Sequence, residues 1–235
     1  LPQRPLMAGE KGVRLSLAGA QNKLPVFIDD KKKICIATGN SPSTHILKPP
    51  IPRIEESVEN EAFCMELASK FGLPVADALI RKNQDTILVV SRYDREKNND
   101  GTILRLHQED FCQALGILPE QKYESEGGPS LEKCFTLLKE HSIRPAADQR
   151  ALLRWTIFNV LIGNADAHAK NLSILFTDKG PRLAPFYDLL STQVYPNLAE
   201  KLAMKIGGEN RVGRLHARNW ERFADAVSLK RRYVL

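Results

Sequence analysis

Two patterns of hydrophobic and polar positions divide the chain near residue 93. Before it, short apolar runs between turn residues predict strands; after about residue 107, apolar residues recur at helical spacing. The predicted strands are Val13–Leu17, Leu24–Ile28, Ile34–Ala37, His45–Leu47 and Ile87–Val90, and the predicted helices are Glu109–Leu115, Leu131–His141 and Ala146–Ile162. We therefore expect an α+β fold of two lobes with a cleft between them. Residues 1–93 form the strand-rich lobe and residues 94–235 the mainly helical lobe.

One helix, predicted for Glu55–Phe71, interrupts the strand-rich half before Gly72 and Pro74. Its expected buried stripe is Val58, Ala62, Met65 and Ala68. Glu61 lies on the same stripe, and a carboxylate that points inward needs a cation. Lys48, at the end of a β-forming run, is the candidate. The alternative is that Lys48 is a surface lysine ahead of a proline pair.

The most densely polar segment follows the most apolar helix. It reads Gly163-Asn164-Ala165-Asp166-Ala167-His168-Ala169-Lys170-Asn171 and precedes a hairpin predicted from residues 172–176 and 182–184. Burying such groups unpaired costs about 1–3 kcal/mol each, so their density needs a reason. Phosphoryl transfer supplies one, with Asp166 as the base-like residue and with Asn171 and Asp188 as Mg²⁺ ligands. The alternative is that Asp166 and Asn171 merely cap a helix and a turn.

Two further features fit phosphoryl transfer but are weak signals alone. His168 could polarise a phosphate oxygen or donate a hydrogen bond, although a structural histidine explains it equally well. The small residues between the first two predicted strands, Ala18 to Lys23, suit a close approach of phosphates. This turn contains one glycine and is neither a GxGxxG nor a Walker A motif.

Composition and charge add limits to this interpretation. Hydrophobic residues make up 43% and charged residues 26%, which is typical of globular domains, and no apolar run approaches the roughly 18–20 residues of a membrane span. We expect a cytoplasmic protein with no membrane partner.

The four cysteines lack metal-site spacing and are expected to be free thiols, mostly buried. The net charge is +6, and residues 199–235 hold nine basic and four acidic residues. Such a surface can attract nucleic acid or an acidic partner, or can simply be a solvated helical face.

Several short stretches together resemble the HipA family of bacterial toxin kinases. They occur in the family's order between residue 14 and about residue 205. The matching stretches are residues 14–23 (RLSLAGAQNK), 44–48 (THILK), 58–61 (VENE), 92–95 (RYDR), 108–113 (QEDFCQ), 122–129 (KYESEGGP), 163–173 and 185–191. The chain starts at Leu1 rather than Met and lacks the family's upstream subdomain and downstream helices. We therefore interpret it as a piece of a longer protein.

The resemblance implies a bilobal protein-kinase-like fold and a serine/threonine protein kinase that uses ATP and Mg²⁺. It also implies the toxin half of a toxin–antitoxin pair. The implied protein substrate belongs to translation, for example an aminoacyl-tRNA synthetase. The other implied partners are a small helix-turn-helix antitoxin and operator DNA, which the toxin reaches through the antitoxin complex.

The family's functional residues carry over onto matching positions. Ser16 matches a loop serine whose autophosphorylation inactivates the enzyme. The nucleotide-binding positions are Ala18, Gly19, Ala20, Gln21, Asn22 and Lys23 in the phosphate loop, Lys48, and Ser91, Arg92 and Tyr93 at the adenine hinge. Asp166 matches the catalytic base. Lys48, Glu61 and His168 are further catalytic candidates, and His168, Asn171 and Asp188 are also nucleotide-binding candidates. Asn171 and Asp188 match the metal ligands.

Two other functions remain open. One is a small-molecule or lipid phosphotransferase of the wider kinase-like superfamily, which would share Asp166, Asn171 and Asp188. Ser16 favours the protein kinase, because a regulatory phosphoserine in the nucleotide loop belongs with the toxin kinases. The other is a DNA-bound corepressor with a decayed active site. The presence of every candidate catalytic side chain argues against decay.

Overall fold

The computed structural model describes residues 22–36, 42–82 and 85–235. Its first half is built on an antiparallel sheet of five strands in the order β2-β1-β3-β5-β4. These strands are β1 (Leu24–Ile28), β2 (Ile34–Ile36), β3 (His45–Lys48), β4 (Ala78–Lys82) and β5 (Thr86–Ser91). The predicted strand Val13–Leu17 lies outside the described residues. Strand β4 escaped prediction because it is an edge strand of mostly half-buried and exposed residues, which weakens the alternating pattern.

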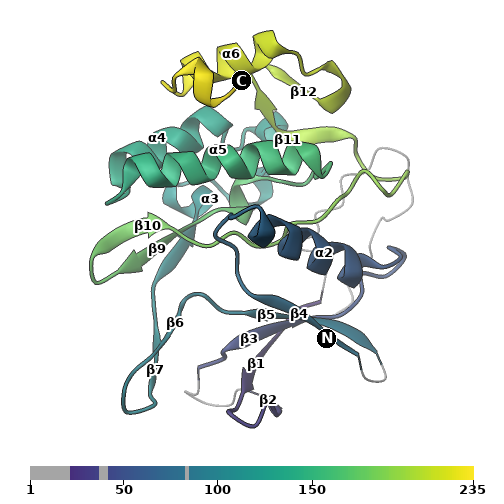
Figure 1. The fold of residues 1–235 in the computed structure, drawn as a ribbon, viewed down its shortest axis with the longest axis vertical. Coiled ribbons are helices and arrows are strands. Elements are labelled where there is room, and N and C mark those ends of the chain that lie inside the picture. The colour runs from purple at the N-terminus through teal and green to yellow at the C-terminus, as the bar shows by residue number, and fades with distance from the viewer. Residues whose placement is uncertain (1–21, 37–41, 83–84) are drawn as a thin grey trace.

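Helix α2 (Ser57–Lys70) connects β3 to β4 and lies between the sheet and the helical half of the molecule (Figure 1). Its buried residues include Val58, Glu61 and Met65, as the stripe predicted. The helix begins two residues later than expected, because Glu56 has a left-handed backbone (φ 51°) that cannot continue a right-handed helix.

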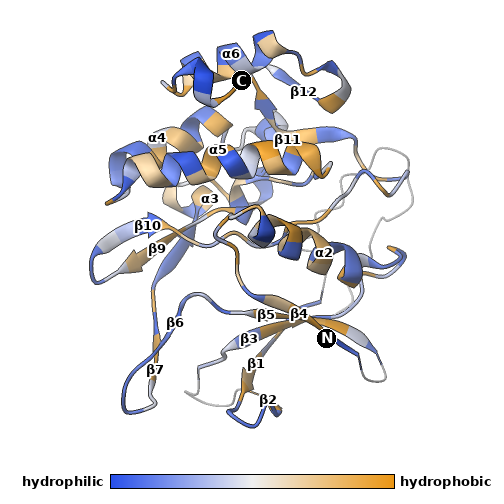
Figure 2. Ribbon diagram, viewed as in Figure 1, coloured by the Kyte–Doolittle hydropathy of each residue, from blue (hydrophilic) through white to orange (hydrophobic). Residues whose placement is uncertain are grey.

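The second half is built around α4 (Leu131–His141) and α5 (Pro145–Leu161), with α3 (Phe111–Ala114) and α6 (Ala217–Ala226) packed nearby. In α5, Leu152, Trp155 and Phe158 are buried in the main hydrophobic core. Figure 2 shows hydrophobic colouring concentrated on α5 and on β11 (Lys201–Ile206), whereas α6 is largely hydrophilic. Burial of this apolar surface supplies the main driving force for folding of this half.

Three small sheets accompany these helices. A three-stranded sheet joins β8 (Gln108–Asp110), β9 (Ser173–Thr177) and β10 (Gly180–Leu183), and two hairpins pair β6 (Arg95–Lys97) with β7 (Ile103–Arg105) and β11 with β12 (Glu209–Arg211). The predicted helix Glu109–Leu115 is therefore partly wrong, since Glu109 and Asp110 are in a strand. The physical reason is a capping box: the Asp110 carboxylate accepts a hydrogen bond from Gln113 N at 2.9 Å and so starts α3 at Phe111.

The segment that carries Asp188 is held by backbone contacts to the segment that follows α2. Phe186 N donates to Pro74 O and Phe186 O accepts from Ala76 N, both at 2.8 Å. The Phe186 ring stacks on Trp155 of α5 at 5.9 Å between centroids. The following residues are thereby fixed between α2 and the helical core. Among the helices that the structure describes, none is long and apolar enough to cross a bilayer.

Candidate active site

Three charged side chains from distant parts of the sequence meet in the interior. Lys48 Nζ, at the end of β3, lies 2.5 Å from Glu61 Oε1 of α2 and 2.8 Å from Asp188 Oδ1. All three side chains are at least nine-tenths buried. The expected contact between Lys48 and Glu61 is present, and Asp188 shares the same ammonium group. Buried charges of this kind are tolerated because each has an opposite charge within hydrogen-bonding distance.

This pairing determines the protonation states of the cluster. Burial alone would raise the pKa of the Asp188 carboxyl, but the Lys48 ammonium, followed by Lys23, overcomes burial and holds that pKa well below its ordinary value. Burial likewise lowers the pKa of Lys48, and the negative charges of Asp188 and Glu61 outweigh it and raise that pKa. At neutral pH the site therefore holds a charged lysine beside an ionised aspartate. The influence of Lys23 brings one residue of the expected phosphate loop into electrostatic range of the cluster.

Asn171 connects this cluster to the polar loop that follows α5. Its Nδ2 donates to Asp188 Oδ2 at 2.7 Å, and its Oδ1 accepts from His168 N at 3.1 Å. Asp188 has a left-handed backbone (φ 61°), which is uncommon for a residue other than glycine and is tolerated best by Asp and Asn. Such backbone conformations concentrate at functional sites.

Asp166 lies in the same buried loop and has its own supports. Its Oδ1 accepts a hydrogen bond from Tyr123 OH at 2.6 Å, and its backbone N donates to Asn164 Oδ1 at 3.1 Å. Asn164 is in turn held by Asn159 at the end of α5, with Nδ2 to Oδ1 at 2.8 Å. This chain of hydrogen bonds explains why so many polar residues follow the apolar helix: they satisfy one another.

Asp188 and Asn171 together suit a hard divalent cation. Mg²⁺ prefers carboxylate and amide oxygens, and it is usually held by one or two carboxylates together with substrate phosphates. Asp188 Oδ2 and Asn171 are already within hydrogen-bonding distance, and each of their oxygens keeps a second lone pair after the contacts described above. The donor set therefore fits Mg²⁺, and Lys48 adds a positive charge on the other carboxylate oxygen.

His168 is fully buried, and its ring meets the ring of Tyr123 edge-on at 5.4 Å between centroids. Neither ring nitrogen has a hydrogen-bond partner among the described residues. Burial, and next the charge of Lys122, lower the pKa of His168 to about 3, so the ring is neutral at pH 7. A neutral ring can orient its neighbours but cannot supply a positive charge.

Acid should destabilise the fold through His168. The unfolded chain takes up this proton near the ordinary pKa of 6.5, whereas the folded chain does so only near 3. The free energy of unfolding should therefore fall as pH drops through this window. The free energy of unfolding can be measured with denaturant at several pH values between 7 and 5. Its dependence on pH should be weaker in His168→Leu than in the wild type, by an amount that corresponds to the uptake of up to about one proton. Identical slopes would mean that His168 does not stay neutral in the fold.

The remaining predicted site residues differ in what the structure says about them. Ser16, Ala18, Gly19, Ala20 and Gln21 lie outside the described residues, and Asn22 is exposed. At the expected hinge, Ser91 closes β5 and is half-buried.

The side chains at the hinge are engaged within the protein. The Arg92 guanidinium pairs with buried Asp94 at 2.6 Å. The Tyr93 ring stacks on Tyr187 at 5.9 Å between centroids, and its hydroxyl donates to Gln108 Oε1 at 2.5 Å. The RYDR motif thus ties the end of the sheet to the segment that carries Asp188.

Lys122 and Tyr123 are site residues that sequence reasoning did not single out. Both are buried and lie more than forty residues away from Asp166 in the chain. Tyr123 donates a hydrogen bond to Asp166, and the charge of Asp166 acts on Lys122. The available signal was the pair Gly127-Gly128 just downstream, which marks a tight turn. A glycine pair predicts the turn but does not indicate which residue the turn contacts.

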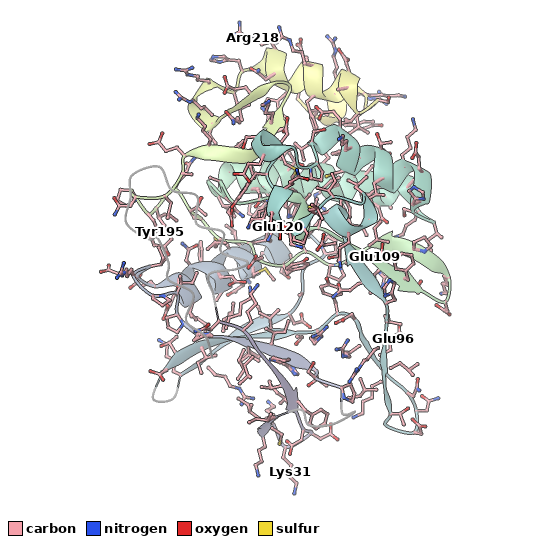
Figure 3. The ribbon with its side chains drawn as sticks, turned by 180° about the vertical axis from the view of Figure 1, so that it is seen from behind. Lys31, Glu96, Glu109, Glu120, Tyr195 and Arg218 are labelled. Atoms are coloured by element: carbon pink, nitrogen blue, oxygen red, sulfur yellow. The ribbon has the colours of Figure 1, made fainter. Side chains whose placement is uncertain are left out.

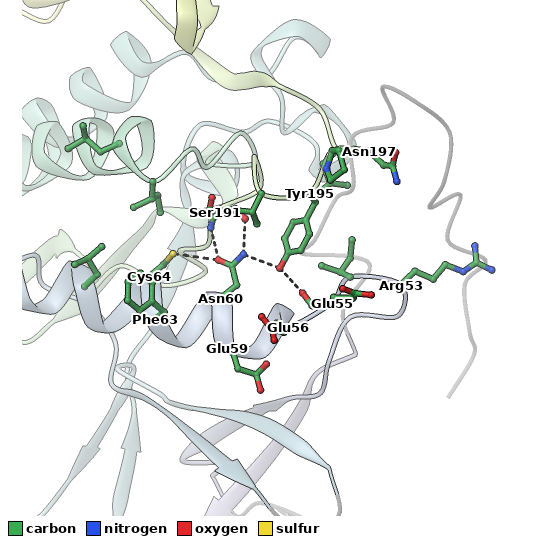
Figure 4. A pocket seen from close by; sticks show the side chains of 17 residues that line it. Arg53, Glu55, Glu56, Glu59, Asn60, Phe63, Cys64, Ser191, Tyr195 and Asn197 are labelled. Atoms are coloured by element: carbon green, nitrogen blue, oxygen red, sulfur yellow. Dashed lines mark hydrogen bonds between the residues drawn. The ribbon is translucent and has the colours of Figure 1, made fainter.

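Asn60 provides a second connection between α2 and the segment after Asp188 (Figure 4). Its Nδ2 donates to Ser191 O at 2.9 Å and to Tyr195 OH at 3.0 Å, while its Oδ1 accepts from Ser191 N at 2.8 Å. These contacts lie in a pocket of about 1190 Å³ between the exposed side of α2, the end of α5 and residues 191–198. Because Asn60 adjoins Glu61, this clamp couples the position of α2 to the chain three residues beyond Asp188.

Replacing Asn60 with alanine should therefore lower stability. It removes both hydrogen bonds to the Ser191 backbone, and we expect a loss of about 1–3 kcal/mol in the free energy of unfolding. Asn60→Asp keeps the acceptor for Ser191 N but turns a second carboxylate oxygen toward the Ser191 carbonyl, so it should also be less stable than the wild type. Urea unfolding followed by circular dichroism gives the values. Equal stabilities for all three proteins would show that the clamp adds nothing.

The fold is that of kinase-like proteins. The structure superposes on the Helicobacter pylori proinflammatory kinase CtkA with a TM-score of 0.54 over 86% of this chain and 81% of that chain, at 14% identity, a likeness of fold alone. The HipA-like C-terminal domain family matches residues 15–235, and the chain belongs to that family.

Individual relatives agree with this assignment. The chain is 53% identical to Y4mE of Sinorhizobium fredii, provisionally named a kinase, over 95% of this chain and 53% of Y4mE. It is 34% identical to the serine/threonine-protein kinase toxin HipA of Shewanella oneidensis, over 94% of this chain and 53% of that protein. It superposes on HipA of S. oneidensis, solved with HipB and its operator DNA, with a TM-score of 0.88 over 99% of this chain and 57% of HipA. The chain thus spans about half the length of the curated relatives it matches.

Proposed function

We propose that this chain is the catalytic core of a HipA-like serine/threonine protein kinase that transfers phosphate from Mg-ATP to a protein hydroxyl. The observation that carries the proposal is the meeting of Lys48, Glu61, Asp188 and Asn171 in one buried cluster, with Asp166 in the adjoining loop. Kinase-like enzymes need a lysine held by a helix glutamate, a metal-binding Asp–Asn pair and an aspartate for the acceptor. We assign residues 1–93 to the nucleotide-binding lobe and residues 94–235 to the catalytic lobe.

The roles follow from the chemistry of each group. Asp166 accepts the hydrogen bond of the acceptor hydroxyl and orients it for attack. Lys48, held by Glu61, positions the phosphates through its charge. Asp188 and Asn171 would hold Mg²⁺, which supplies charge neutralisation between the phosphates when it is bound. The fully buried His168 would shape the loop around Asp166 rather than transfer a proton.

We assign the adenine contact to the main chain of Ser91–Tyr93, because the Arg92 and Tyr93 side chains are engaged with Asp94 and Tyr187. The phosphate loop is assigned to residues 18–23. The electrostatic influence of Lys23 on Asp188 supports that assignment.

We further propose that the longer protein is the toxin of a bacterial toxin–antitoxin system. Support comes from the structural relative, which was solved as HipA with HipB and operator DNA. An antitoxin with a helix-turn-helix, and operator DNA reached through it, are the corresponding partners. The proposed substrate is a protein of translation, such as an aminoacyl-tRNA synthetase. The basic residues of 199–235, including the exposed Arg218 in Figure 3, are a surface suited to the DNA in such a complex.

Labelling with γ-labelled ATP tests the kinase proposal. Incubation of the full-length protein should leave label on Ser16, and Ser16→Ala should abolish that label. A phosphate adds about −1.5 to −2 charges, so phosphorylated Ser16 should also bind ATP less tightly than the unmodified protein. Turnover of a soluble alcohol or a lipid without any protein label would instead favour the small-molecule phosphotransferase. Operator binding by the complex without any ATP turnover would favour the corepressor.

A further inference from the structure

The loop between α3 and α4 faces Asp166, and the proposed function leaves it without a role. It contains the stretch KYESEGGP, residues 122–129, and its place is marked by Glu120 in Figure 3. Its first two residues, Lys122 and Tyr123, are 6% and 5% exposed, whereas its other charged residues are half-buried or exposed. A lysine this deeply buried is rare in proteins and needs a specific reason.

The rest of the loop holds Lys122 and Tyr123 in one position. Gly128 N donates to Tyr123 O at 2.9 Å, and a Cβ on Gly128 would lie 2.3 Å from Gln121 O, so no larger residue fits there. Glu124 accepts a hydrogen bond from Lys205 N of β11 at 2.6 Å. The backbone around the two side chains is therefore anchored both within the loop and to the core.

The Tyr123 side chain is directed at the proposed reaction centre, and the Lys122 ammonium lies near its ring. The Tyr123 hydroxyl donates to Asp166 Oδ1 at 2.6 Å, and its ring meets buried His168 edge-on. Lys122 Nζ lies 4.9 Å from the centre of the Tyr123 ring. Burial lowers the pKa of Lys122, and the charges of Asp166 and then Asp188 act against that fall, so the ammonium shares the electrostatic environment of both carboxylates.

Two further lysines near the centre pair with carboxylates. Lys48 is shared between Glu61 and Asp188, and Lys170, four residues after Asp166, pairs with Asp110 at 2.6 Å. Phosphoryl transfer spreads negative charge over the oxygens of the moving group, and a cation aimed at those oxygens lowers the barrier. Among the described residues, Lys122 is a buried cation within electrostatic reach of Asp166 and Asp188.

We propose that Lys122 is a catalytic residue whose ammonium stabilises the phosphoryl group during transfer, and that Tyr123 is a positioning residue that orients Asp166. This inference rests on the proposed kinase function. In the step, the acceptor oxygen forms a bond to the γ-phosphorus, and the bond from that phosphorus to the β–γ bridging oxygen breaks, with its electron pair leaving on ADP. The acceptor proton passes to the Asp166 carboxylate. Lys122 remains protonated throughout.

Binding of a transition-state mimic tests Lys122 without relying on turnover. The full-length protein is titrated with Mg-ADP, with and without aluminium fluoride, and the Lys122→Met and Lys122→Arg variants are compared with Lys139→Met, which removes an exposed lysine of α4. Aluminium fluoride should tighten Mg-ADP binding by the wild type and by Lys139→Met. In Lys122→Met the ratio of the Mg-ADP affinity with aluminium fluoride to the affinity without it should be about 100-fold smaller than in the wild type. The kcat should fall to a similar extent. Lys122→Arg keeps the charge and should recover part of both.

The outcomes separate the two proposals. Mg-ADP affinity within about threefold of the wild type shows that Lys122→Met retains the nucleotide site, so a lost tightening then supports the role of Lys122. Tightening in Lys122→Met equal to that of the wild type overturns the inference and leaves the kinase function intact. A wild type that neither tightens with aluminium fluoride nor transfers phosphate overturns both.

Tyr123→Phe tests the positioning role, since it removes only the hydroxyl. It should lower kcat about tenfold and leave the KM for ATP unchanged, because the lost contact acts on Asp166 and not on the nucleotide. In an Asp166→Asn background the same change should have little further effect, because residues that act as a unit are not additive. An equal loss in both backgrounds, or a rise in KM with kcat unchanged, would overturn the role.

Discussion

Replacing Asp166 with asparagine should lower phosphoryl transfer by about 10²–10⁴-fold and leave Mg-ATP binding nearly unchanged. The amide oxygen can still accept the hydrogen bond from Tyr123, so the loop should keep its arrangement. What is lost is the carboxylate that orients the acceptor hydroxyl and receives its proton. In the described part of the chain, hydrogen bonds join the loop residues 166–171 to the Lys48–Asp188 cluster through Asn171, whereas the Asp166 side chain accepts from Tyr123, so binding and transfer should separate.

Two measurements on one preparation check this prediction. Nucleotide titration gives the Mg-ATP affinity, and labelled-phosphate transfer gives the rate. Asp178→Asn is the matched control, because it makes the same chemical change at an exposed position beyond β9 and should behave as the wild type does. Transfer by Asp166→Asn at the control rate would contradict the assignment of Asp166 as the base.

Replacing Asp188 with asparagine should weaken Mg-ATP binding itself, by about 10²-fold. The change removes a buried carboxylate that pairs with Lys48 at 2.8 Å and is the only charged member of the proposed metal-ligand pair. Losing one partner of a buried charge pair costs about 2–5 kcal/mol, and each 1.4 kcal/mol is a tenfold change in affinity. Lys48 keeps Glu61 at 2.5 Å, so the fold should survive.

Titration with ATP in the presence and absence of Mg²⁺ separates the two roles of Asp188. The affinity lost by the variant should be larger with Mg²⁺ than in excess EDTA, because the metal depends on the carboxylate more directly than the nucleotide does. An affinity that falls equally in both conditions would contradict metal binding by Asp188. A matching Mg-dependent loss in Asp178→Asn would point to a general effect of charge.

The contact between Lys48 and Glu61 could be predicted because a helix repeats every 3.6 residues. An acid on the apolar stripe must point inward, and the nearest lysine at the end of a strand was its natural partner. The spacing of Asp166, Asn171 and Asp188 likewise predicted that they meet. Two of them are in contact, with Asn171 Nδ2 at 2.7 Å from Asp188 Oδ2.

The contacts that could not be predicted join residues that no local pattern links. The hydrogen bond from Tyr123 to Asp166 spans 43 residues, and the Asn60 clamp reaches Ser191 across 131 residues. The helix expected from Glu109 failed for a related reason: periodicity favoured a helix, but the side chain of Asp110 capped the next turn and strand pairing to β9 took its backbone. Hydrogen bonds between distant segments, together with the local cap at Asp110, decided these positions.

The left-handed backbone of Asp188 has a consequence for the range of amino acids that this position tolerates. In a saturation library scored only for folded protein, backbone conformation would admit glycine and asparagine with little cost, whereas β-branched residues would be depleted. A second score for activity would then remove glycine, which fits the turn but carries no oxygen. Comparing the two scores at this one codon would show which amino acids are excluded by the backbone conformation and which are excluded because they lack a metal-binding oxygen.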